Sequence, residues 1–153
     1  MKGSGRSIAL AAASAALATG VLAAPAAADS SQAGAGVVAN VTVHSRGDGV
    51  KPPAVLGDPK EWGVVELTID DSAGSVTPMT TIEVGGGQWA YGWYSVSNGK
   101  YCYSNYYHYS VMHGSTVQIA GDSNKSVEAA GNTSMAHLTR GAAYTCKTFY
   151  AKY

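Results

Sequence analysis

The segment Glu83–His113 constrains the fold most, because it places a strong hairpin signal inside a run of aromatic residues. It holds two of the three tryptophans and most of the ten tyrosines. At its centre, Asn98-Gly99 separates two β-rich stretches, Gln88–Val96 and Lys100–Tyr109. An Asn-Gly pair favours a two-residue type I′ turn, in which both central residues take positive φ. The sequence therefore predicts an antiparallel hairpin with Asn98 and Gly99 as its loop.

With that loop, Val96 pairs with Tyr101, and alternate side chains point to opposite faces of the hairpin. We expect one face to be inward because it carries two tryptophans and a cysteine: Trp89, Tyr91, Trp93, Cys102, Ser104, Tyr106 and His108. The other face is mainly tyrosine: Ala90, Tyr94, Val96, Tyr101, Tyr103, Tyr107 and Tyr109. Tyrosine rings suit an exposed binding surface, although cross-strand aromatic pairs also simply stabilise a small sheet. A slip of one residue in the pairing would exchange the two faces.

The rest of the chain after residue 36 consists of short β-rich runs separated by Gly, Asn, Asp and Pro. Expected strands lie at 37–44, 62–70, 80–84, 115–120, 126–130, 135–139 and 143–150, with a Gly-Asp-Ser-Asn turn at 121–124. Helical periodicity with capping residues is not found in these runs. This pattern is typical of an all-β protein built as an antiparallel sandwich or barrel.

The N-terminus has the features of an export signal. Lys2 and Arg6 precede an apolar run over 8–24, and Ala26-Ala27-Ala28 offers small residues for cleavage. The run is short for a membrane-spanning helix, which needs about 20 residues. We therefore expect a signal peptide over 1–28, a secreted extracellular protein, and no membrane span after cleavage.

Charge divides the remainder into two parts. Residues 29–81 carry 3 basic and 7 acidic side chains, whereas 82–153 carry 5 and 3. We expect an acidic N-terminal extension over 29–81, with its strand candidates at 37–44 and 62–70, followed by a β-domain over 82–153. The slightly negative total gives no reason to expect nucleic acid as a partner.

Cys102 and Cys146 are the two cysteines of the chain. In an exported protein such a pair most simply forms a disulfide, and neither belongs to a C-x-x-C motif. Closing a loop of this length contributes about 4 kcal/mol on the chain-entropy model. We expect a structural disulfide.

Signals for catalysis or metal binding are weak. The spacing of His108, His113 and His137 matches no zinc motif, and no G-x-S-x-G elbow occurs. Glu83, Asp122 and Glu128 are the nearest carboxylate candidates for a wall hydrolase, which would need a pair of them close together in space. The prediction is a protein without catalytic residues, metal or other cofactor.

Several short motifs occur together in a fixed order. They are V-G-G-G-Q-W-A-Y-G at 84–92, Y-S-N-Y-Y-H at 103–108, H-G-S-T-V at 113–117, A-A-G at 129–131 and F-Y at 149–150. In this order they resemble the lactococcin 972 family of secreted bacteriocins over about residues 82–153. The cysteine pair and the acidic extension depart from the minimal family pattern.

The resemblance implies a β-sandwich of short antiparallel strands. It further implies an exported antibacterial protein that acts outside the target cell on wall synthesis and its precursor lipid II, without forming pores. A homodimer is possible. The matching motif residues are Trp89, Tyr103, Ser104, Asn105, Tyr106, His108 and His113, with Gly92 as a further structural position.

Among these residues we expect the target contacts to include the two histidines, since an imidazolium would attract the anionic pyrophosphate of the precursor at mildly acidic pH. The expected contacts are His108, His113, Tyr107, Asn105 and Tyr103. Two other functions stay open. One is an extracellular adhesion or interaction module that docks a protein or glycan on the tyrosine face, and the other is the wall hydrolase.

Overall fold

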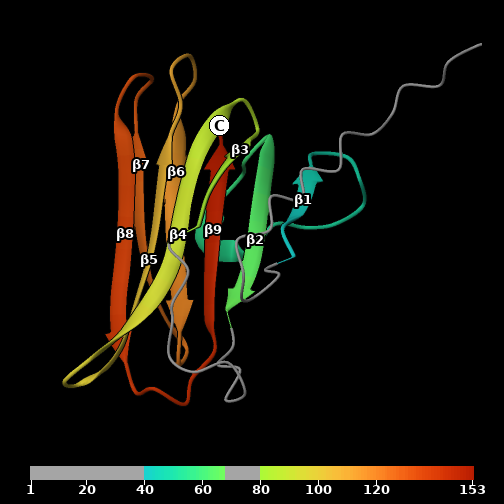
Figure 1. The fold of residues 1–153 in the computed structure, drawn as a ribbon. Helices are drawn as coiled ribbons and strands as arrows, with labels where there is room; N and C mark the ends of the chain where they lie inside the picture. The colour runs from blue at the N-terminus through green and yellow to red at the C-terminus, as the bar shows by residue number, and fades with distance from the viewer. Residues whose placement is uncertain (1–39, 68–79) are drawn as a thin grey trace, which may run out of the picture. The chain divides into compact units, whose positions relative to one another are not determined.

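The computed structural model describes residues 40–67 and 80–153. The expected signal peptide lies outside these residues, as do 37–39 and 68–70 of the first two expected strands. The described elements are β1 Thr42–Ser45, the short 3-10 helix η1 Ala54–Leu56, β2 Glu61–Leu67, β3 Thr80–Val84, β4 Gly87–Val96, β5 Gly99–Tyr107, β6 His113–Ile119, β7 Asp122–Glu128, β8 Thr133–Arg140 and β9 Cys146–Lys152 (Figure 1). In these two ranges no helix has the length and apolar character needed to cross a membrane.

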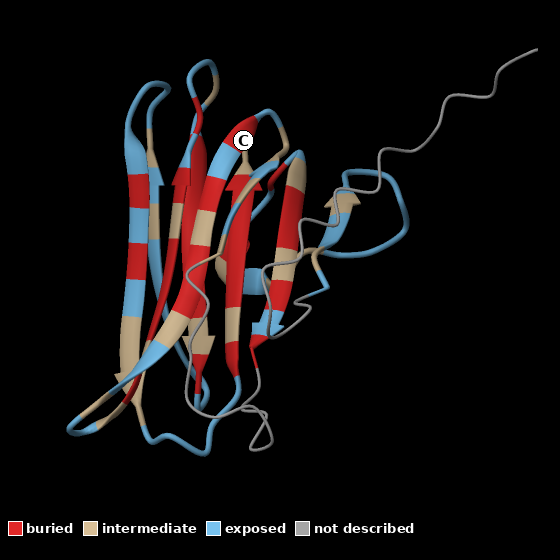
Figure 2. Ribbon diagram, viewed as in Figure 1, coloured by how far each residue is buried: buried red, intermediate tan, exposed pale blue. Residues whose placement is uncertain are grey.

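The strands form two sheets, and every pairing between neighbours is antiparallel. We call them sheet A, with the order β1-β2-β9-β6-β7, and sheet B, with the order β3-β4-β5-β8. Side chains alternate between buried and exposed along the edge strand β8, as expected for a sheet with one face in the core (Figure 2). The arrangement confirms the expected small antiparallel β-sandwich.

One hydrophobic core joins the two sheets. Its most buried members come from six strands: Val65, Leu67, Trp89, Tyr91, Cys102, Tyr106, Val117, Ile119, Ala136, Cys146 and Tyr150. Cys102 of β5 and Cys146 of β9 form a disulfide across this core, with their Cα atoms 6.3 Å apart. The expected disulfide is thus confirmed, and it ties sheet B to sheet A.

The outer side of sheet A is covered by the chain itself. Leu56 of η1 is fully buried and packs with Trp62, Phe149 and Ala151, which point away from the main core. The Lys125 ammonium group and the Tyr153 hydroxyl both donate hydrogen bonds to the Leu56 carbonyl, at 2.8 and 2.9 Å. The segment between β1 and β2 therefore lies over sheet A as a second, smaller core.

Strand β2 lies in the expected acidic extension and pairs with β9 along its whole length. Strand β3 crosses the expected boundary between residues 81 and 82. The division into 1–28, 29–81 and 82–153 stays a prediction about processing and function, but residues 61–67 are an integral part of sheet A.

Two expected turns differ from the structure. Val96 pairs with Gly99, so the loop is Ser97-Asn98 and not Asn98-Gly99. Gly99 takes a positive φ of 135° just after the loop, while neither Ser97 nor Asn98 does. The pairing is shifted by two residues from the expected register, and because side chains alternate with period two, the expected faces are kept.

The second wrong turn is the one expected at 121–124. Ile119 pairs with Asp122, so the loop is Ala120-Gly121 and Asp122–Asn124 belong to β7. Ala120 and Gly121 have φ values of 55° and 84°. Positive φ at both loop positions is what a type I′ turn requires. This conformation therefore occurs at Ala120-Gly121 and not at the predicted Asn98-Gly99 pair.

Candidate functional site

The inward face of the β4–β5 hairpin holds the fold together through a chain of hydrogen bonds. The indole nitrogen of Trp89 donates to Ser104 Oγ at 2.9 Å, and Ser104 Oγ donates to the Phe149 carbonyl at 2.8 Å. Trp89 and Ser104 have no exposed surface, and the indole packs edge-on against Tyr150 at 5.2 Å between ring centroids. These two motif residues therefore connect β4, β5 and β9, and water does not reach them.

A polar network fixes the glycine turn that joins β3 to β4. The Tyr106 hydroxyl donates to the Val84 carbonyl at 3.0 Å. Burial raises the pKa of Tyr106, and the nearby carboxylates of Glu61 and Glu83 raise it further. Gly85 has a φ of 61°, and a Cβ atom there would lie 2.9 Å from the Tyr106 hydroxyl. The turn needs glycine because the backbone approaches the tyrosine too closely for a side chain.

Glu61, the first residue of β2, completes this network. Its carboxylate accepts a hydrogen bond from Tyr150 at 2.9 Å and pairs with Lys152 at 3.1 Å. Lys152 also donates to the Gly85 carbonyl at 2.7 Å. Burial, followed by the Glu61 charge, raises the pKa of Tyr150. Sequence reasoning missed this network, because Glu61 and Tyr150 lie 89 residues apart.

His108 lies directly after β5, is buried, and binds backbone groups through both ring nitrogens. Its Nδ1 accepts hydrogen bonds from the backbone N–H groups of Ser110 and Val111, at 3.2 and 3.3 Å. Its Nε2 lies 3.2 Å from the Gly85 carbonyl oxygen. Because Nδ1 accepts, the proton sits on Nε2, which donates to Gly85. The ring thus links the β5–β6 loop to the glycine turn as a neutral imidazole.

His113 opens β6 and has no exposed surface. Its Nδ1 lies 2.9 Å from the Val111 carbonyl oxygen and its Nε2 lies 3.0 Å from the Asn132 carbonyl oxygen. A neutral imidazole can donate to one of these oxygens, and an imidazolium can donate to both. The side chain connects the β5–β6 loop to the β7–β8 turn.

Together the two histidines hold the loop 109–112 at both ends. The N–H of Val111 binds His108, its carbonyl faces His113, and the Met112 carbonyl accepts from the Tyr153 N–H at 2.9 Å. The side chains of Tyr109 and Met112 are left 69% and 52% exposed. This geometry gives the histidines a positioning role, and the expected direct contact of His108 and His113 with a target stays a prediction.

The outward face of sheet B carries an aromatic cluster from three strands. Tyr94 and Tyr101 stack with ring centroids 4.7 Å apart, and His137 of β8 stacks on Tyr101 at 5.3 Å. Tyr103 lies 6.5 Å from both tyrosines. We call these four residues the aromatic cluster. Alternation along the hairpin predicted the tyrosines on this face, but His137 joins them only because β8 pairs with β5.

Tyr103 is the most enclosed member of the cluster. It lies opposite Gly92 in the register, where the missing side chain leaves room for the ring. Tyr103 is 7% exposed, and its buried hydroxyl has no hydrogen-bond partner among the described residues. Burial and the neighbouring Tyr94 raise the pKa of Tyr103 above its usual value. A neutral hydroxyl is therefore held in this face without a partner for its hydrogen.

Asn105 and Tyr107 continue the same face toward the other end of β5. Asn105 is half-buried and Tyr107 is 37% exposed. Together with Tyr103, these residues are the expected contacts that lie on the outward side. At the outward positions of the described strands β3, β4, β5 and β8 there is no lysine or arginine, and Glu83 is the one carboxylate, bonded to Gln88 at 2.7 Å.

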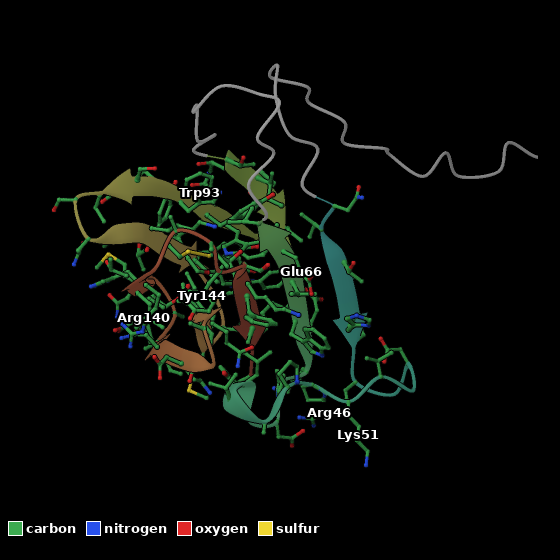
Figure 3. The ribbon with its side chains drawn as sticks, turned by 90° about the horizontal axis from the view of Figure 1, so that it is seen from below. Arg46, Lys51, Glu66, Trp93, Arg140 and Tyr144 are labelled. Atoms are coloured by element: carbon green, nitrogen blue, oxygen red, sulfur yellow. A yellow bond between two sulfur atoms is a disulfide. The ribbon has the colours of Figure 1, made fainter. Side chains whose placement is uncertain are left out.

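The opposite end of the hairpin contains a buried lysine that sequence reasoning also missed. Lys100 is 1% exposed, and its ammonium group donates to the Tyr144 carbonyl at 2.7 Å and lies 4.8 Å from the centre of the Trp93 ring. Burial lowers the pKa of Lys100. Figure 3 views this end, with Trp93, Tyr144 and Arg140 labelled. The cation is satisfied by a carbonyl and an aromatic ring, so it stabilises the β8–β9 loop.

Two of the three candidate catalytic carboxylates, Asp122 and Glu128, lie far apart on β7. Asp122 is paired with Arg140 at 2.6 Å, and Glu128 stands six residues further along the same strand. At about 3.4 Å per residue the two carboxylates are about 20 Å apart, whereas glycosidase pairs are separated by about 5 to 9.5 Å. His137 lies outward while His108 and His113 lie inside, and residues 40–67 and 80–153 contain no group of three potential metal ligands.

The β4–β5 hairpin and the strands after it match a known protein family. Residues 85–150 match the family described as Bacteriocin (Lactococcin_972). No curated protein and no solved structure matches the chain. The matched segment begins in the glycine turn before β4 and ends in β9, so it includes the motif residues, the aromatic cluster and both cysteines. The resemblance inferred from the sequence is thus confirmed over residues 85–150.

Proposed function

We propose that this protein is an exported bacteriocin that binds the wall precursor lipid II outside the target cell and blocks wall or septum synthesis without forming pores. The match to the bacteriocin family supports the bacteriocin-like function. The observation that carries the binding proposal is the exposed tyrosine face of sheet B, which has no lysine or arginine at its described positions and belongs to a disulfide-linked sandwich. Tyr and His side chains held by neighbouring rings present contact area with little loss of side-chain entropy.

Binding, and not turnover, is the activity that these side chains support. Around Gly85, the Tyr106 hydroxyl bonds the Val84 carbonyl, and the Glu61 carboxylate is bonded to Tyr150 and Lys152, which fits a structural role for these groups. Sequestration requires one protein molecule for each precursor molecule or small group of them. Inhibition should therefore depend on stoichiometry, and the protein should need no metal or other cofactor.

The contacts are proposed on the outward side of β5, where Tyr103, Asn105 and Tyr107 lie in one row. His108 and His113 act indirectly in this proposal by holding the adjoining loop. Asn105 lies between Tyr103 and Tyr107 along β5, and its amide has both donor and acceptor groups. Such a row suits a hydroxyl-rich and amide-rich ligand.

The same exposed face also favours a second candidate, an extracellular interaction module that docks another protein or a glycan. The purified protein, with its disulfide intact and without residues 1–28, distinguishes the two. We expect growth inhibition of sensitive bacteria without rapid depolarisation, and binding to vesicles that contain lipid II but not to vesicles of phospholipid alone. Growth inhibition that does not change when purified lipid II is added as a competitor would contradict the proposal, and capture of a protein partner without lipid II binding would favour the second candidate.

A further inference from the structure

The outward face of sheet B differs from an anion-binding site in its charge. Its positions in β3, β4, β5 and β8 carry no lysine or arginine, and the two histidines expected to meet a pyrophosphate are buried and bonded to backbone groups. Phosphate groups are usually bound by arginine, lysine or clustered backbone N–H groups. This face therefore does not offer the chemistry that a pyrophosphate requires.

The face instead offers flat aromatic surface surrounded by neutral polar groups. Tyr94 is 46% exposed and stacks on Tyr101, and His137 extends the platform on the far side of Tyr101. Thr139 lies beside Tyr101 in the register, and Asn105 lies two residues beyond Tyr103. Rings with adjacent hydroxyl and amide groups match a ligand that has apolar C–H faces and hydroxyl edges.

A second, independent observation is the hydroxyl of Tyr103, which has no hydrogen-bond partner within residues 40–67 and 80–153. A buried polar group without a hydrogen bond destabilises the folded protein, so such a group needs an explanation. The hydroxyls of Tyr101 and Tyr103 are protonated at neutral pH, as tyrosines ordinarily are, and burial raises the pKa of both further. The hydroxyl of Tyr103 is therefore an enclosed donor and acceptor that has no partner among the described residues and belongs to the same aromatic cluster as the exposed ring of Tyr94.

We propose that the aromatic cluster of Tyr94, Tyr101, Tyr103 and His137 is a carbohydrate site that stacks an uncharged sugar ring and bonds it through the Tyr103 hydroxyl. The inference rests on the proposed function in one respect, because it assigns the disaccharide part of the precursor, and not its pyrophosphate, to this face. An uncharged glycan is the occupant that we infer, because the outward neighbours of the cluster on β4, β5 and β8 are uncharged side chains.

Three soluble or vesicle-borne probes test this assignment with the disulfide-bonded protein: diacetylchitobiose, lipid II in vesicles, and sugar-free undecaprenyl pyrophosphate in the same vesicles. We expect binding to the first two and none to the third. Tyr101→Ala should weaken binding to both sugar-bearing probes by about tenfold or more. Tyr144→Ala is the matched control, because Tyr144 is also exposed, at 53%, but lies in the β8–β9 loop.

Tyr103→Phe separates the hydroxyl from the ring. The variant should fold with unchanged or higher stability, because it removes an unpartnered polar group, and should bind diacetylchitobiose several times more weakly. Equal affinity of Tyr103→Phe and wild type for the sugar would overturn the role of the hydroxyl.

The outcomes distinguish this inference from the proposed function. Binding to lipid II and to undecaprenyl pyrophosphate alike, unaffected by Tyr101→Ala, would overturn the carbohydrate site and leave the proposed function standing. Binding to diacetylchitobiose but not to lipid II would support the site and contradict the proposed function. Absence of binding to diacetylchitobiose and to lipid II would overturn both.

Discussion

The outer faces of the two sheets carry aromatic side chains in similar positions but meet different surroundings. On sheet A, Trp62 and Phe149 are 6% and 2% exposed, because Leu56 and its loop lie over them. On sheet B, Tyr94 is 46% exposed and has stacked neighbours in its own sheet. The residue types fit the difference, since tyrosine hydroxyls tolerate water and the phenylalanine ring does not form hydrogen bonds. Sheet A is protected by its own chain, whereas sheet B presents a surface suited to a partner.

The largest loss of stability should come from truncating the side chain that covers the outer face of sheet A. Leu56→Ala deletes a fully buried side chain beside Trp62 and Phe149, so we expect the free energy of unfolding to fall by about 2–5 kcal/mol. Denaturant unfolding measures it, with Val50→Ala as the control because Val50 is 47% exposed nearby in the chain. A loss as small as that of Val50→Ala would mean that the loop does not protect sheet A.

The next largest loss of stability should come from breaking the hydrogen bond between Trp89 and Ser104 on the inward face of the hairpin. Trp89→Phe keeps an aromatic ring in the core but removes the indole donor to Ser104 and part of the packing against Tyr150. We expect a loss of about 1–3 kcal/mol in the free energy of unfolding. Thermal unfolding of Trp93→Phe, which alters a half-buried tryptophan on the same strand, provides the comparison, and an equal or larger effect there would contradict the importance assigned to the Trp89–Ser104 bond.

Replacing His113 should destabilise the loop 109–112 more than the rest of the sandwich. His113→Ala removes the group that faces the Val111 and Asn132 carbonyls, so the loop 109–112 should open more often. Amide hydrogen exchange at Met112 and the loop around it should accelerate by tenfold or more, while exchange in the β4–β5 pairing changes by the global loss of stability alone. Uniform acceleration across both regions would show that His113 supports the whole sandwich and not the loop.

Alkaline pH should lower the stability of the protein, because two tyrosines in its core have raised pKa values. Folding raises the pKa of Tyr106 and Tyr150 above the ordinary value of 10.0, mainly through burial. The folded state then holds more protons than the unfolded state above that pH, so stability is complete below about pH 10 and falls as the pH rises further. Tyr150→Phe should reduce the slope of stability against pH, and an unchanged slope in that variant would contradict the assignment.

The smallest effect on stability should occur at the exposed aromatic cluster. Tyr101→Ala removes stacking contacts on a face that needs no core packing, so we expect a loss of about 0.5–1.5 kcal/mol or less. Chemical denaturation of Tyr101→Ala beside Leu56→Ala sharpens the contrast between the two outer faces. A Tyr101→Ala loss as large as the Leu56→Ala loss would identify the cluster as structural.

Much of the fold was predictable from local chemistry. Period-two alternation gave the inward position of Trp89 and the outward position of Tyr101, and the two cysteines gave the disulfide. The register was wrong by two residues because Gly99 supplies its positive φ after the loop and not inside it. Local signals do not determine which glycine of a turn region takes that conformation.

The long-range parts of the site were not predictable in this way. Glu61 meets Tyr150, and His137 meets Tyr101, only after β2 pairs with β9 and β8 pairs with β5. The burial of His113 likewise depends on the β7–β8 turn that supplies the Asn132 carbonyl. Each of these contacts joins residues far apart in sequence, so the pattern around either partner alone carries no sign of it.

The central claim is that the outward face of sheet B, and not the covered face of sheet A, receives the wall precursor. The most direct measurement is mapping of NMR chemical-shift changes when a soluble lipid II analogue is added to the isotope-labelled protein. We expect the changes to centre on the outward face of sheet B, at Tyr94, Tyr101, Tyr103, Asn105, Tyr107 and His137, while Trp62 and Phe149 keep their shifts. Changes centred on sheet A, or on the loop 109–112 without the aromatic cluster, would contradict it.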